Sequence, residues 1–517
     1  MTSAVRARRF TLLATGLGSA LAFLDATVVI VALPRMDVDL GLGLTGQQWV
    51  VLGYALALSA LLLVGGAAGD RFGLRRTFGA GVVVFAVASL ACAVAPESGL
   101  LVAARAFQGV GAAALTTTSL ALLRVVWAED AGRAIGLWTS LTAVATVAGP
   151  PLGGVLVEYV SWRWIFIINV PLAVVVVALA AAGRAEDERQ PADGRLDIVG
   201  SLLAAVGLAC LTFALVEVRQ RGPGAVLAVG AVGIAALGGL AVWTLRSRDP
   251  LVPPRLLRRP GLAAANAATL AIYAALGATF FFVPVYLQFL GLSPMLASLV
   301  FVPPSIALIL LAPRFGRYAD RNGPRRPVTA GALGIAASAL LLLPVDDRTG
   351  AWAWGGLSVA VLSLSLAVLV APITAAALSP APGDLAGIAS GLNQTVARVG
   401  GVLSVAGIGA LAGWVYEAQG GEAAAPFEPA TFDAFAGPAS DAFRVTIVGI
   451  ALLAILGAAI SGTKVAGTAP EAPVAPAGLE GEPAVSPCPP AGPGADPAYR
   501  SAPSRRSSST LRSSPPA

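Results

Sequence analysis

Long apolar segments recur along almost the whole of this 517-residue chain, and they constrain its fold more than any other feature. The first begins near Thr11 and the last ends near Ser461. Only 12% of the residues are charged, whereas about a quarter are charged in an ordinary soluble protein. A helix needs roughly 20 apolar residues to cross the hydrocarbon core of a bilayer, where its backbone must be hydrogen-bonded internally. The sequence therefore predicts an all-α protein that crosses a membrane many times.

We count fourteen segments that are long enough to span the bilayer, with boundaries known to within several residues. The first of them, Phe10 to Pro34, could be mistaken for a secretory signal peptide, but it is long, holds an aspartate and lacks a convincing cleavage site, so we interpret it as a span. The approximate centres of the fourteen segments are Leu21, Leu58, Val87, Ala112, Val147, Val174, Gly207, Ile234, Ala274, Ala307, Ala336, Leu364, Val402 and Leu453.

Basic residues are distributed unequally between alternate loops. With the N-terminus placed in the cytoplasm, the cytoplasmic segments hold 26 of the 34 basic residues and the external segments hold six, while Arg105 and Arg398 lie inside spans. Because an excess of basic residues marks the cytoplasmic side, both termini are predicted to be cytoplasmic. Arginine outnumbers lysine 33 to 1, which is typical of a GC-rich bacterial genome. We expect the protein in the cytoplasmic membrane of a bacterium.

Several chemistries are excluded by the residue types that the chain lacks. There is no histidine, so a Ser-His-Asp triad, an imidazole metal ligand and a histidine proton relay are excluded. Cys92, Cys210 and Cys488 are too scattered to form a zinc or iron-sulfur cluster. The only lysine, Lys464, does not belong to a GxxxxGK nucleotide-binding loop. We expect no enzyme activity, cofactor, metal or nucleic-acid partner, and transport that draws on an ion gradient.

An internal repeat relates the two halves of the chain. Residues 66–76 read GAAGDRFGLRR after the second predicted span, and residues 316–326 read GRYADRNGPRR after the tenth, with six identities at a constant offset of 250. Two copies in register, each at a cytoplasmic helix end, indicate duplicated halves of the kind found in many transporters. Spans one to six and nine to fourteen would form two six-helix bundles, with spans seven and eight as an inserted pair.

This repeat divides the chain into five parts. Residues 1–10 are a cytoplasmic N-terminal segment, 11–183 the first bundle, 184–260 the two-helix insert with its flanking cytoplasmic loops, and 261–464 the second bundle. Residues 465–517 are dominated by proline, alanine, serine and glycine without apolar periodicity, so we predict a disordered cytoplasmic tail.

Two ionisable residues are placed deep within predicted spans. Asp25 lies nine residues before Pro34 and Arg105 lies eight residues after Glu97, which puts both at roughly 12 to 13 Å from the outer ends of their helices. The two side chains could therefore meet. A buried carboxylate is costly unless it is paired or protonated, so such a group can exchange a proton as the conformation changes. The alternatives are a permanent structural ion pair or an aspartate that orders a broken helix end.

Five stretches of the chain resemble motifs of one transporter family. Ile30 replaces a usual asparagine in the first, Leu74 a usual basic residue in the second, and Thr117 stands near the third where proline is common. The stretches are residues 24–34, 66–76, 101–111, 149–154 and 161–171, of which the last is the most specific. On these residues the chain resembles the major facilitator superfamily, and within it the fourteen-span drug:proton antiporters of the EmrB/QacA type.

The resemblance implies roles for several groups of residues. It implies that Asp25 and Arg105 take part in proton and substrate exchange, and that the repeated loops form a latch for one access state, beyond the topological role of their positive charge. The loop residues are Gly66, Asp70, Arg71, Gly73, Arg75, Gly316, Asp320, Arg321, Gly323 and Arg325. In the fifth span glycines permit close helix packing and a proline removes a backbone donor; the resemblance implies a bend typical of exporters, at Gly149, Pro150, Gly153 and Gly154.

A further polar group is equally compatible with substrate contact and with bonding between helices. It consists of Gln108 in the fourth span and Asn393, Gln394 and Arg398 in the thirteenth. Aromatic residues between Phe280 and Phe289 could line an apolar pocket, but such a cluster more often faces lipid or packs inside the protein.

The expected function is proton-coupled efflux by alternating access. Because Asp25 would be the only deep counter-charge, a lipophilic neutral or monocationic drug or antibiotic fits best. The rivals are an exporter of a metabolite made by the cell, such as an antibiotic, lipid or siderophore, and, less favoured, a non-transporting membrane protein. An enzyme acting on lipid-linked sugars would need a polar catalytic cluster that the loops lack. The expected partners are the small substrate, protons and the lipid bilayer; the oligomeric state is open and a monomer would suffice.

Overall fold

The computed structural model describes residues 3–127, 131–183, 197–218, 221, 223–247, 254–257, 259–378, 386–421, 427 and 432–465. Within these residues the regular structure is helical throughout. The chain divides into a compact unit, Met1–Pro470, and a second unit, Glu471–Ala517. The predicted tail lies outside the described residues except for Val465, and so does much of the cytoplasmic loop before the insert, at 184–196.

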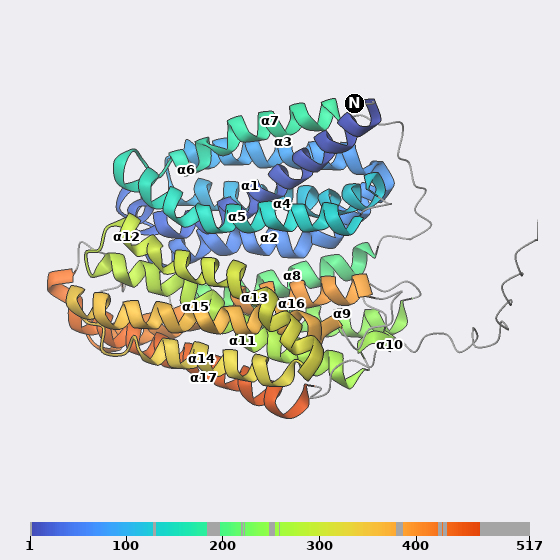
Figure 1. Cartoon of the computed structure of the whole chain (residues 1–517). Coiled ribbons are helices and arrows are strands. Elements are labelled where there is room, and N and C mark those ends of the chain that lie inside the picture. Colours follow the sequence, from blue (N-terminus) through green and yellow to red (C-terminus); the bar gives the residue numbers. More distant parts are fainter. Residues whose placement is uncertain are drawn as a thin grey trace, which may run out of the picture. The chain divides into compact units, whose positions relative to one another are not determined.

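The first bundle is built around α1, which packs against α4, α5 and α7. Helix α4 also packs against α2 and α3, so α1 and α4 together form the centre of this half. Figure 1 shows these helices in blue to teal on one side of the unit. Their bounds are α1 (Ser3–Leu40), α2 (Gly43–Phe72), α3 (Leu74–Ala93), α4 (Ser98–Val126), α5 (Ala131–Tyr159), α6 (Trp164–Ile167) and α7 (Asn169–Ala182).

The insert and the second bundle follow. Helices α8 (Ile198–Val216) and α9 (Pro223–Arg246) pack on each other, and α10 (Pro254–Leu257) is a short turn before the second bundle. In that bundle α11 packs against α16 and α17, and α15 against α13 and α14. The bounds are α11 (Pro260–Phe289), α12 (Pro294–Ser298), the 3-10 turn η2 (Leu299–Phe301), α13 (Val302–Asn322), α14 (Arg325–Leu340), α15 (Arg348–Leu378), α16 (Ala386–Ala418) and α17 (Phe432–Lys464).

Eleven helical segments in the described part of the chain are long and apolar enough to cross a membrane. Each of the fourteen expected centres lies in a separate helix; the three centres outside those eleven segments lie in α2, α5 and α14. Helix α14 has 16 residues, fewer than the roughly 20 that a perpendicular span requires. The described residues thus contain about eleven candidate spans, and the full fourteen and the cytoplasmic termini stay predictions.

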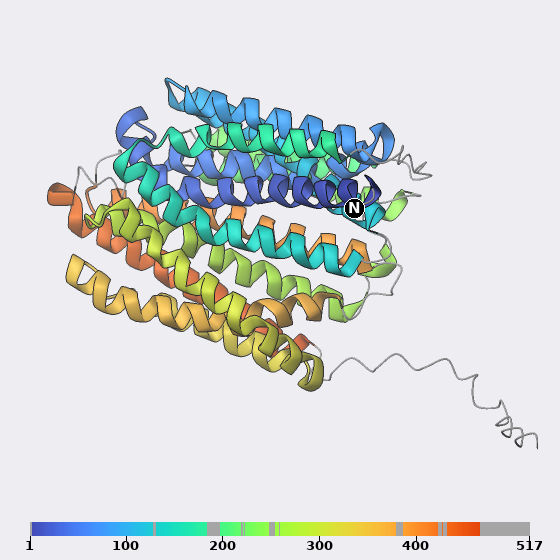
Figure 2. The same cartoon turned by 45° about the horizontal axis from the view of Figure 1, so that its top comes forward.

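The two bundles meet along helices from both halves and from the insert. Helix α1 packs against α11, α2 against α16, and α12 against α5, while α8 contacts both α2 and α16. The second view shows the same division, with the first bundle above and the second below (Figure 2). Buried side chains of both halves share one apolar core, in which Val31 of α1 and Phe282 of α11 are members.

Among the described residues, three hydrogen bonds join the two bundles. The Gln48 side chain donates to the Val405 carbonyl at 2.6 Å, and the Gln288 side chain to the Val31 carbonyl at 3.1 Å. The third runs from the backbone N–H of Met295 to the Glu158 carboxylate at 3.3 Å. In the first bundle all of these groups lie near the end where α1 and α5 finish and α2 begins, which is the predicted external end.

Candidate functional site

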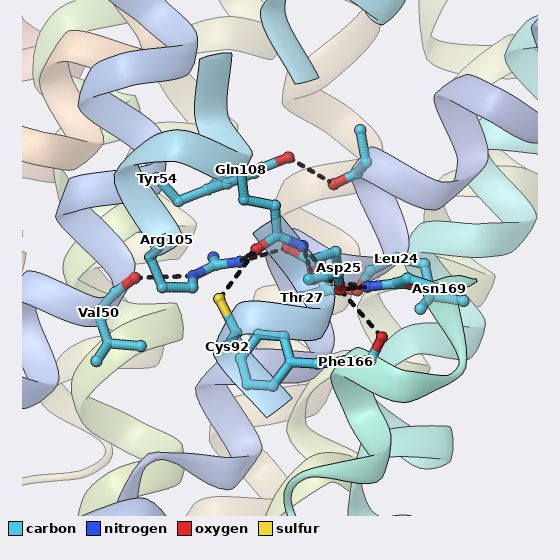
Figure 3. A network of polar contacts seen from close by, with 12 residues as sticks. Leu24, Asp25, Thr27, Val50, Tyr54, Cys92, Arg105, Gln108, Phe166 and Asn169 are labelled. Atoms are coloured by element: carbon cyan, nitrogen blue, oxygen red, sulfur yellow. Dashed lines mark hydrogen bonds and ion pairs between the residues drawn. The ribbon is translucent and has the colours of Figure 1, made fainter. Parts of the chain in front are cut away.

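A buried ion pair lies at the centre of the first bundle. The Asp25 carboxylate on α1 and the Arg105 guanidinium on α4 meet at 2.6 Å, with side chains 0% and 1% exposed. This is the contact that the depths of the two residues along their helices made possible. A buried pair is retained only where the desolvated charges find further hydrogen bonds, and Figure 3 shows that these are present on every side.

Both carboxylate oxygens of Asp25 accept hydrogen bonds. Oδ2 accepts from Arg105, while Oδ1 accepts from the amides of Gln108 at 2.9 Å and Asn169 at 3.0 Å. The same two amides donate to the Ser89 hydroxyl at 3.2 and 2.9 Å, and that hydroxyl donates to the Phe166 carbonyl. Four helices, α1, α3, α4 and α7, therefore converge on one carboxylate.

The guanidinium of Arg105 is fixed as tightly as its partner. Its Nε donates to the Val50 carbonyl at 3.0 Å, and its Nη1 donates to the Gln108 side-chain oxygen at 2.6 Å. Its central carbon lies 4.3 Å from the centre of the Tyr54 ring and 5.8 Å from that of Phe166. Cation–π contacts of this kind are favourable when the ion is desolvated. The charge of Arg105 is thus held between two rings and an anion.

One polar atom of this network has no partner. The side-chain oxygen of Asn169 is buried and accepts no hydrogen bond within the described part of the chain. It belongs to the amide that donates to Asp25. A protonated carboxyl group needs an acceptor for its new hydrogen, and rotation of the Asn169 amide would supply one next to Asp25.

A cavity of about 330 Å³ lies between the two bundles. Its wall comes from α1, α2 and α4 on one side and from α11 and α16 on the other. Arg105 and Tyr54 belong to that wall, so the ion pair borders the cavity although Asp25 itself is fully buried. The remaining wall is largely apolar, with Phe23, Phe280 and Phe281 as its aromatic members.

The four residues predicted as possible substrate contacts do not lie together in the structure. Arg398 lines the cavity. Gln108 is held in the Asp25 network, and the Asn393 side chain accepts a hydrogen bond from Thr269 at 2.9 Å, which joins α16 to α11. Gln394 is exposed and is not part of the cavity wall. Of the four, only Arg398 belongs to the wall of this cavity.

The aromatic residues of α11 divide in the same way. Phe280 and Phe281 line the cavity, and the Phe280 ring stacks on Phe301 at 5.1 Å between centres. Tyr286 instead stacks on Phe443 at 3.6 Å and donates to the Val345 carbonyl, inside the second bundle. Two of the alternatives left open by the sequence, pocket wall and packing, are therefore realised by different members of the cluster.

The repeated loops place equivalent glycines at equivalent breaks. Gly73 separates α2 from α3 with φ 96°, and Gly323 separates α13 from α14 with φ 82°. L side chains are strained in this region, which explains why the repeat keeps glycine there. Arg75 donates to Thr11 of α1 and to Ala180 of α7, inside the first bundle.

The other loop residues lie along the adjoining helices. Gly66, Asp70 and Arg71 lie in the last turns of α2; Gly316, Asp320 and Arg321 lie in the corresponding turns of α13; and Arg325 begins α14. Arg71, Asp320, Arg321 and Arg325 are exposed.

The glycines of α5 lie against the helix that carries Asp25. A Cβ atom at Gly149 would meet Thr27, and one at Gly153 would come within 2.6 Å of Val28, both on α1. At Gly154 it would come within 2.6 Å of the Met295 backbone in the opposite bundle. Pro150 and Pro151 lie inside the continuous helix Ala131–Tyr159. The three glycines therefore determine how closely α5 approaches α1 and α12.

Two residues of the network were not found from the sequence. Asn169 lies within residues 161–171, the stretch most similar to the transporter family, which is the signal that could have drawn attention to it. Ser89 lies in an apolar helix with nothing to distinguish it from a serine that packs. As for metals, no group of three or more aspartate, glutamate or cysteine side chains gathers among the residues searched, which are the described ones.

Comparison with known proteins decides the family. Residues 15–405 match the sequence model of the Major Facilitator Superfamily. The chain belongs to this superfamily. Membership makes it a multi-pass membrane protein and points to a transporter rather than an enzyme.

Relatives within the superfamily are named for drug resistance and export. The chain is 34% identical to the multidrug resistance protein Stp of Mycobacterium tuberculosis over 79% of its own length and 77% of that protein. It is 35% identical to the tetracenomycin C resistance and export protein of Streptomyces glaucescens, over 78% and 75%. It is 36% identical to the cephamycin export protein CmcT of Amycolatopsis lactamdurans, over 74% and 80%.

Solved structures share the fold of this superfamily member. A bacterial homologue of the lysosomal transporter Spinster, in an inward-facing and occupied conformation, matches with a TM-score of 0.61 at 16% identity over 88% of this chain and 96% of the other. The D-xylose-proton symporter matches with a TM-score of 0.58 at 14% identity, over 89% and 98%. At such low identity these structures support the arrangement of helices and nothing about the cargo.

Proposed function

We propose that this protein is a proton-coupled antiporter that exports small lipophilic molecules across the cytoplasmic membrane of a bacterium by alternating access. The observation that carries the proposal is the Asp25 carboxylate, which is fully buried yet bonded to an arginine that lines the cavity. Intramembrane ionisable groups in such a position are functional by default. The names of the relatives support transport out of the cell, because two of them are called export proteins.

The geometry supports a competition between proton and cargo at this pair. A proton that binds Asp25 neutralises the carboxylate and removes the charge that holds Arg105 at 2.6 Å. The Asn169 oxygen can accept the added hydrogen after its amide rotates, since that oxygen has no other partner in the described residues. Arg105 would then shift its interactions towards the cavity that it lines. One protonation event would in this way alter the cavity wall without exposing Asp25.

The subfamily, topology and latch belong to the same proposal. We assign the chain to the fourteen-span EmrB/QacA type with both termini in the cytoplasm, supported by the fourteen helices that hold the expected span centres and by the charge bias of the loops. The loops at 66–76 and 316–326 would stabilise one access state. The bundle contacts near Gln48 and Met295 at the predicted external end are compatible with a state closed to the outside.

The structure does not support the cationic cargo that the sequence left open. The expectation of a monocation depended on Asp25 as a counter-charge, but Asp25 does not line the cavity and is already paired. We therefore keep the lipophilic part of that interpretation and drop the cation. A foreign drug and a metabolite made by the cell share the same mechanism, and the relatives include proteins named for resistance and for export.

Proton coupling is energetically sufficient. One proton that moves through 100 mV supplies about 2.3 kcal/mol, which corresponds to a roughly fifty-fold gradient of an uncharged molecule.

The test is expression in an efflux-deficient bacterium exposed to a panel of dyes, antiseptics and antibiotics, with and without an uncoupler. We expect resistance that the uncoupler abolishes. Asp25→Asn should insert and fold, because asparagine keeps the shape of the side chain and one oxygen that accepts hydrogen bonds. It cannot take up a proton, so the variant should no longer drive export along a pH gradient in proteoliposomes. Proton-driven export by that variant at the wild-type rate would remove Asp25 from the mechanism.

A further inference from the structure

The cavity carries a positive charge that the described residues do not balance. Arg105 and Arg398 line it from opposite bundles, but only Arg105 has an anionic partner, Asp25. Arg398 makes no ion pair and no hydrogen bond with any described residue, and the described wall contains no aspartate or glutamate.

A second polar group in the same wall is also without a partner. Ser59 on α2 is 8% exposed, and its hydroxyl makes no hydrogen bond within the described structure. Buried hydroxyls in folded proteins are nearly always bonded, so an exception calls for an explanation. Arginine stays protonated in proteins and is costly within a membrane unless it is paired. Two unsatisfied donors on one apolar cavity together indicate an acceptor that arrives with a ligand.

Resting on the proton-coupled export proposed above, we propose that Arg398 and Ser59 bind a carboxylate group, a planar oxyanion, on a lipophilic cargo. The guanidinium fork matches two oxygens of such a group, and the serine hydroxyl supplies one further donor. The apolar rings of the cargo would lie against Phe280 and Phe281, which line the same cavity. The cargo class is thus an amphiphilic organic anion of a size that a cavity of about 330 Å³ admits.

An anionic cargo also suits the direction of transport. An anion that leaves and a proton that enters both move charge in the sense that an inside-negative membrane potential favours. Each charge that crosses 100 mV corresponds to a roughly fifty-fold gradient. Exchange of an anion for a proton therefore moves two charges in the direction that the membrane potential favours, whereas exchange of a neutral cargo for a proton moves only one.

Binding to the purified full-length protein in nanodiscs tests the proposal. The probes are pyrene-1-carboxylate and its neutral isostere pyrene-1-carboxamide, whose fluorescence reports binding against empty nanodiscs. We expect the wild type to bind the carboxylate at least ten-fold more tightly than the amide. Arg398→Gln should reduce this preference to within two-fold, and Arg398→Lys should keep part of it, because lysine retains the charge without the fork.

Controls separate recognition from folding. Arg444→Gln removes an exposed arginine that pairs with Asp441 away from the cavity, and it should leave the ten-fold preference unchanged. Ser59→Ala should weaken carboxylate binding several-fold with a smaller effect on the amide. Melting of each unliganded variant shows that it is folded, and the comparison of the two probes on the wild type needs no variant.

The outcomes distinguish this inference from the proposed function. Equal or tighter binding of the amide by the wild type, or a full carboxylate preference in Arg398→Gln, overturns oxyanion recognition even where uncoupler-sensitive export is observed. A carboxylate preference that depends on Arg398 supports recognition even where no proton-driven export is found, and in that case it is the proposed function that fails.

Discussion

Ser89 joins the side chains that hold the Asp25 carboxylate in place. Its hydroxyl accepts from both amides that donate to Asp25, those of Gln108 and Asn169, and itself donates to the Phe166 carbonyl. A serine hydroxyl offers one donor and two acceptor sites, so the side chain is fully used. The orientation of both amides, and through them the position of the carboxylate, depends on this single oxygen.

Ser89→Ala should therefore destabilise the first bundle. The change leaves two amide donors and one carbonyl with one partner fewer in a buried site, at a cost of about 1 to 3 kcal/mol in the free energy of unfolding. SDS unfolding of the purified protein measures it. Ser404→Ala is the matched control, because the Ser404 hydroxyl bonds only to Gly401 of its own helix. An equal effect of the two substitutions would contradict the role assigned to Ser89.

The sequence could place Asp25 and Arg105 at one depth but could not find Ser89 or Asn169. Depth follows from the rise per residue once the end of a helix is known. Which side chains face inward depends on the rotation of each helix, which is read from amphipathic periodicity. Helices α3 and α7 are apolar over most of their surface, so little in their pattern fixes that rotation.

At the scale of helices, the distance between α1 and α5 is set by glycines. Gly149 and Gly153 contact Thr27 and Val28, the residues that follow Asp25 on α1 by two and three positions. Small residues let membrane helices approach closely, and that packing is a main source of their association. The close approach of α5 therefore supports the stretch of α1 that carries the carboxylate.

Gly153→Ala should push these helices apart. The new Cβ would lie 2.6 Å from a Val28 methyl and 3.0 Å from the Val28 carbonyl, closer than van der Waals contact. We expect a lower melting temperature and slower export, with partial rescue by the additional change Val28→Ala. Gly407→Ala in α16 is the control, because nothing lies within 4 Å of its Cβ position; helix propensity alone predicts no loss there. A Gly153→Ala protein as stable as the control would contradict the packing argument.

The internal repeat predicted where two helices end, but the sequence did not predict the short helices. Its equivalent glycines mark the breaks after α2 and α13, where the structure has φ 96° and 82°. The short helices α6, α10 and α12 were not expected, because segments of four or five residues carry no periodic pattern. Hydropathy locates long helices well because length in the bilayer is a strong constraint.

At the scale of the whole transporter, contacts between bundles are concentrated near one end. Gln48, Gln288 and Met295 supply the hydrogen bonds between the bundles that are described above, and Gly154 packs against the Met295 backbone. The sequence could predict two bundles from the repeat but not which end would be closed, because one sequence must be compatible with both access states. Polar side chains that bond a backbone carbonyl across the interface form contacts that can be broken without leaving a buried charge.

Locking this end should stop transport. In a background with the three cysteines replaced, the exposed residues Glu158 and Met295 are changed to cysteine and joined by a short bifunctional thiol reagent. The two residues face each other across the bundle interface, where the Met295 backbone nitrogen lies 3.3 Å from the Glu158 carboxylate. If the bundles rock apart here to release cargo, cross-linking should abolish export in proteoliposomes.

The control joins Asp39→Cys to Arg163→Cys, an exposed pair 3.5 Å apart within the first bundle, where cross-linking should leave export unchanged. Because each protein is compared with itself before and after cross-linking, any loss caused by the substitutions cancels. Export that survives complete cross-linking of the first pair would show that the bundles need not separate at this end.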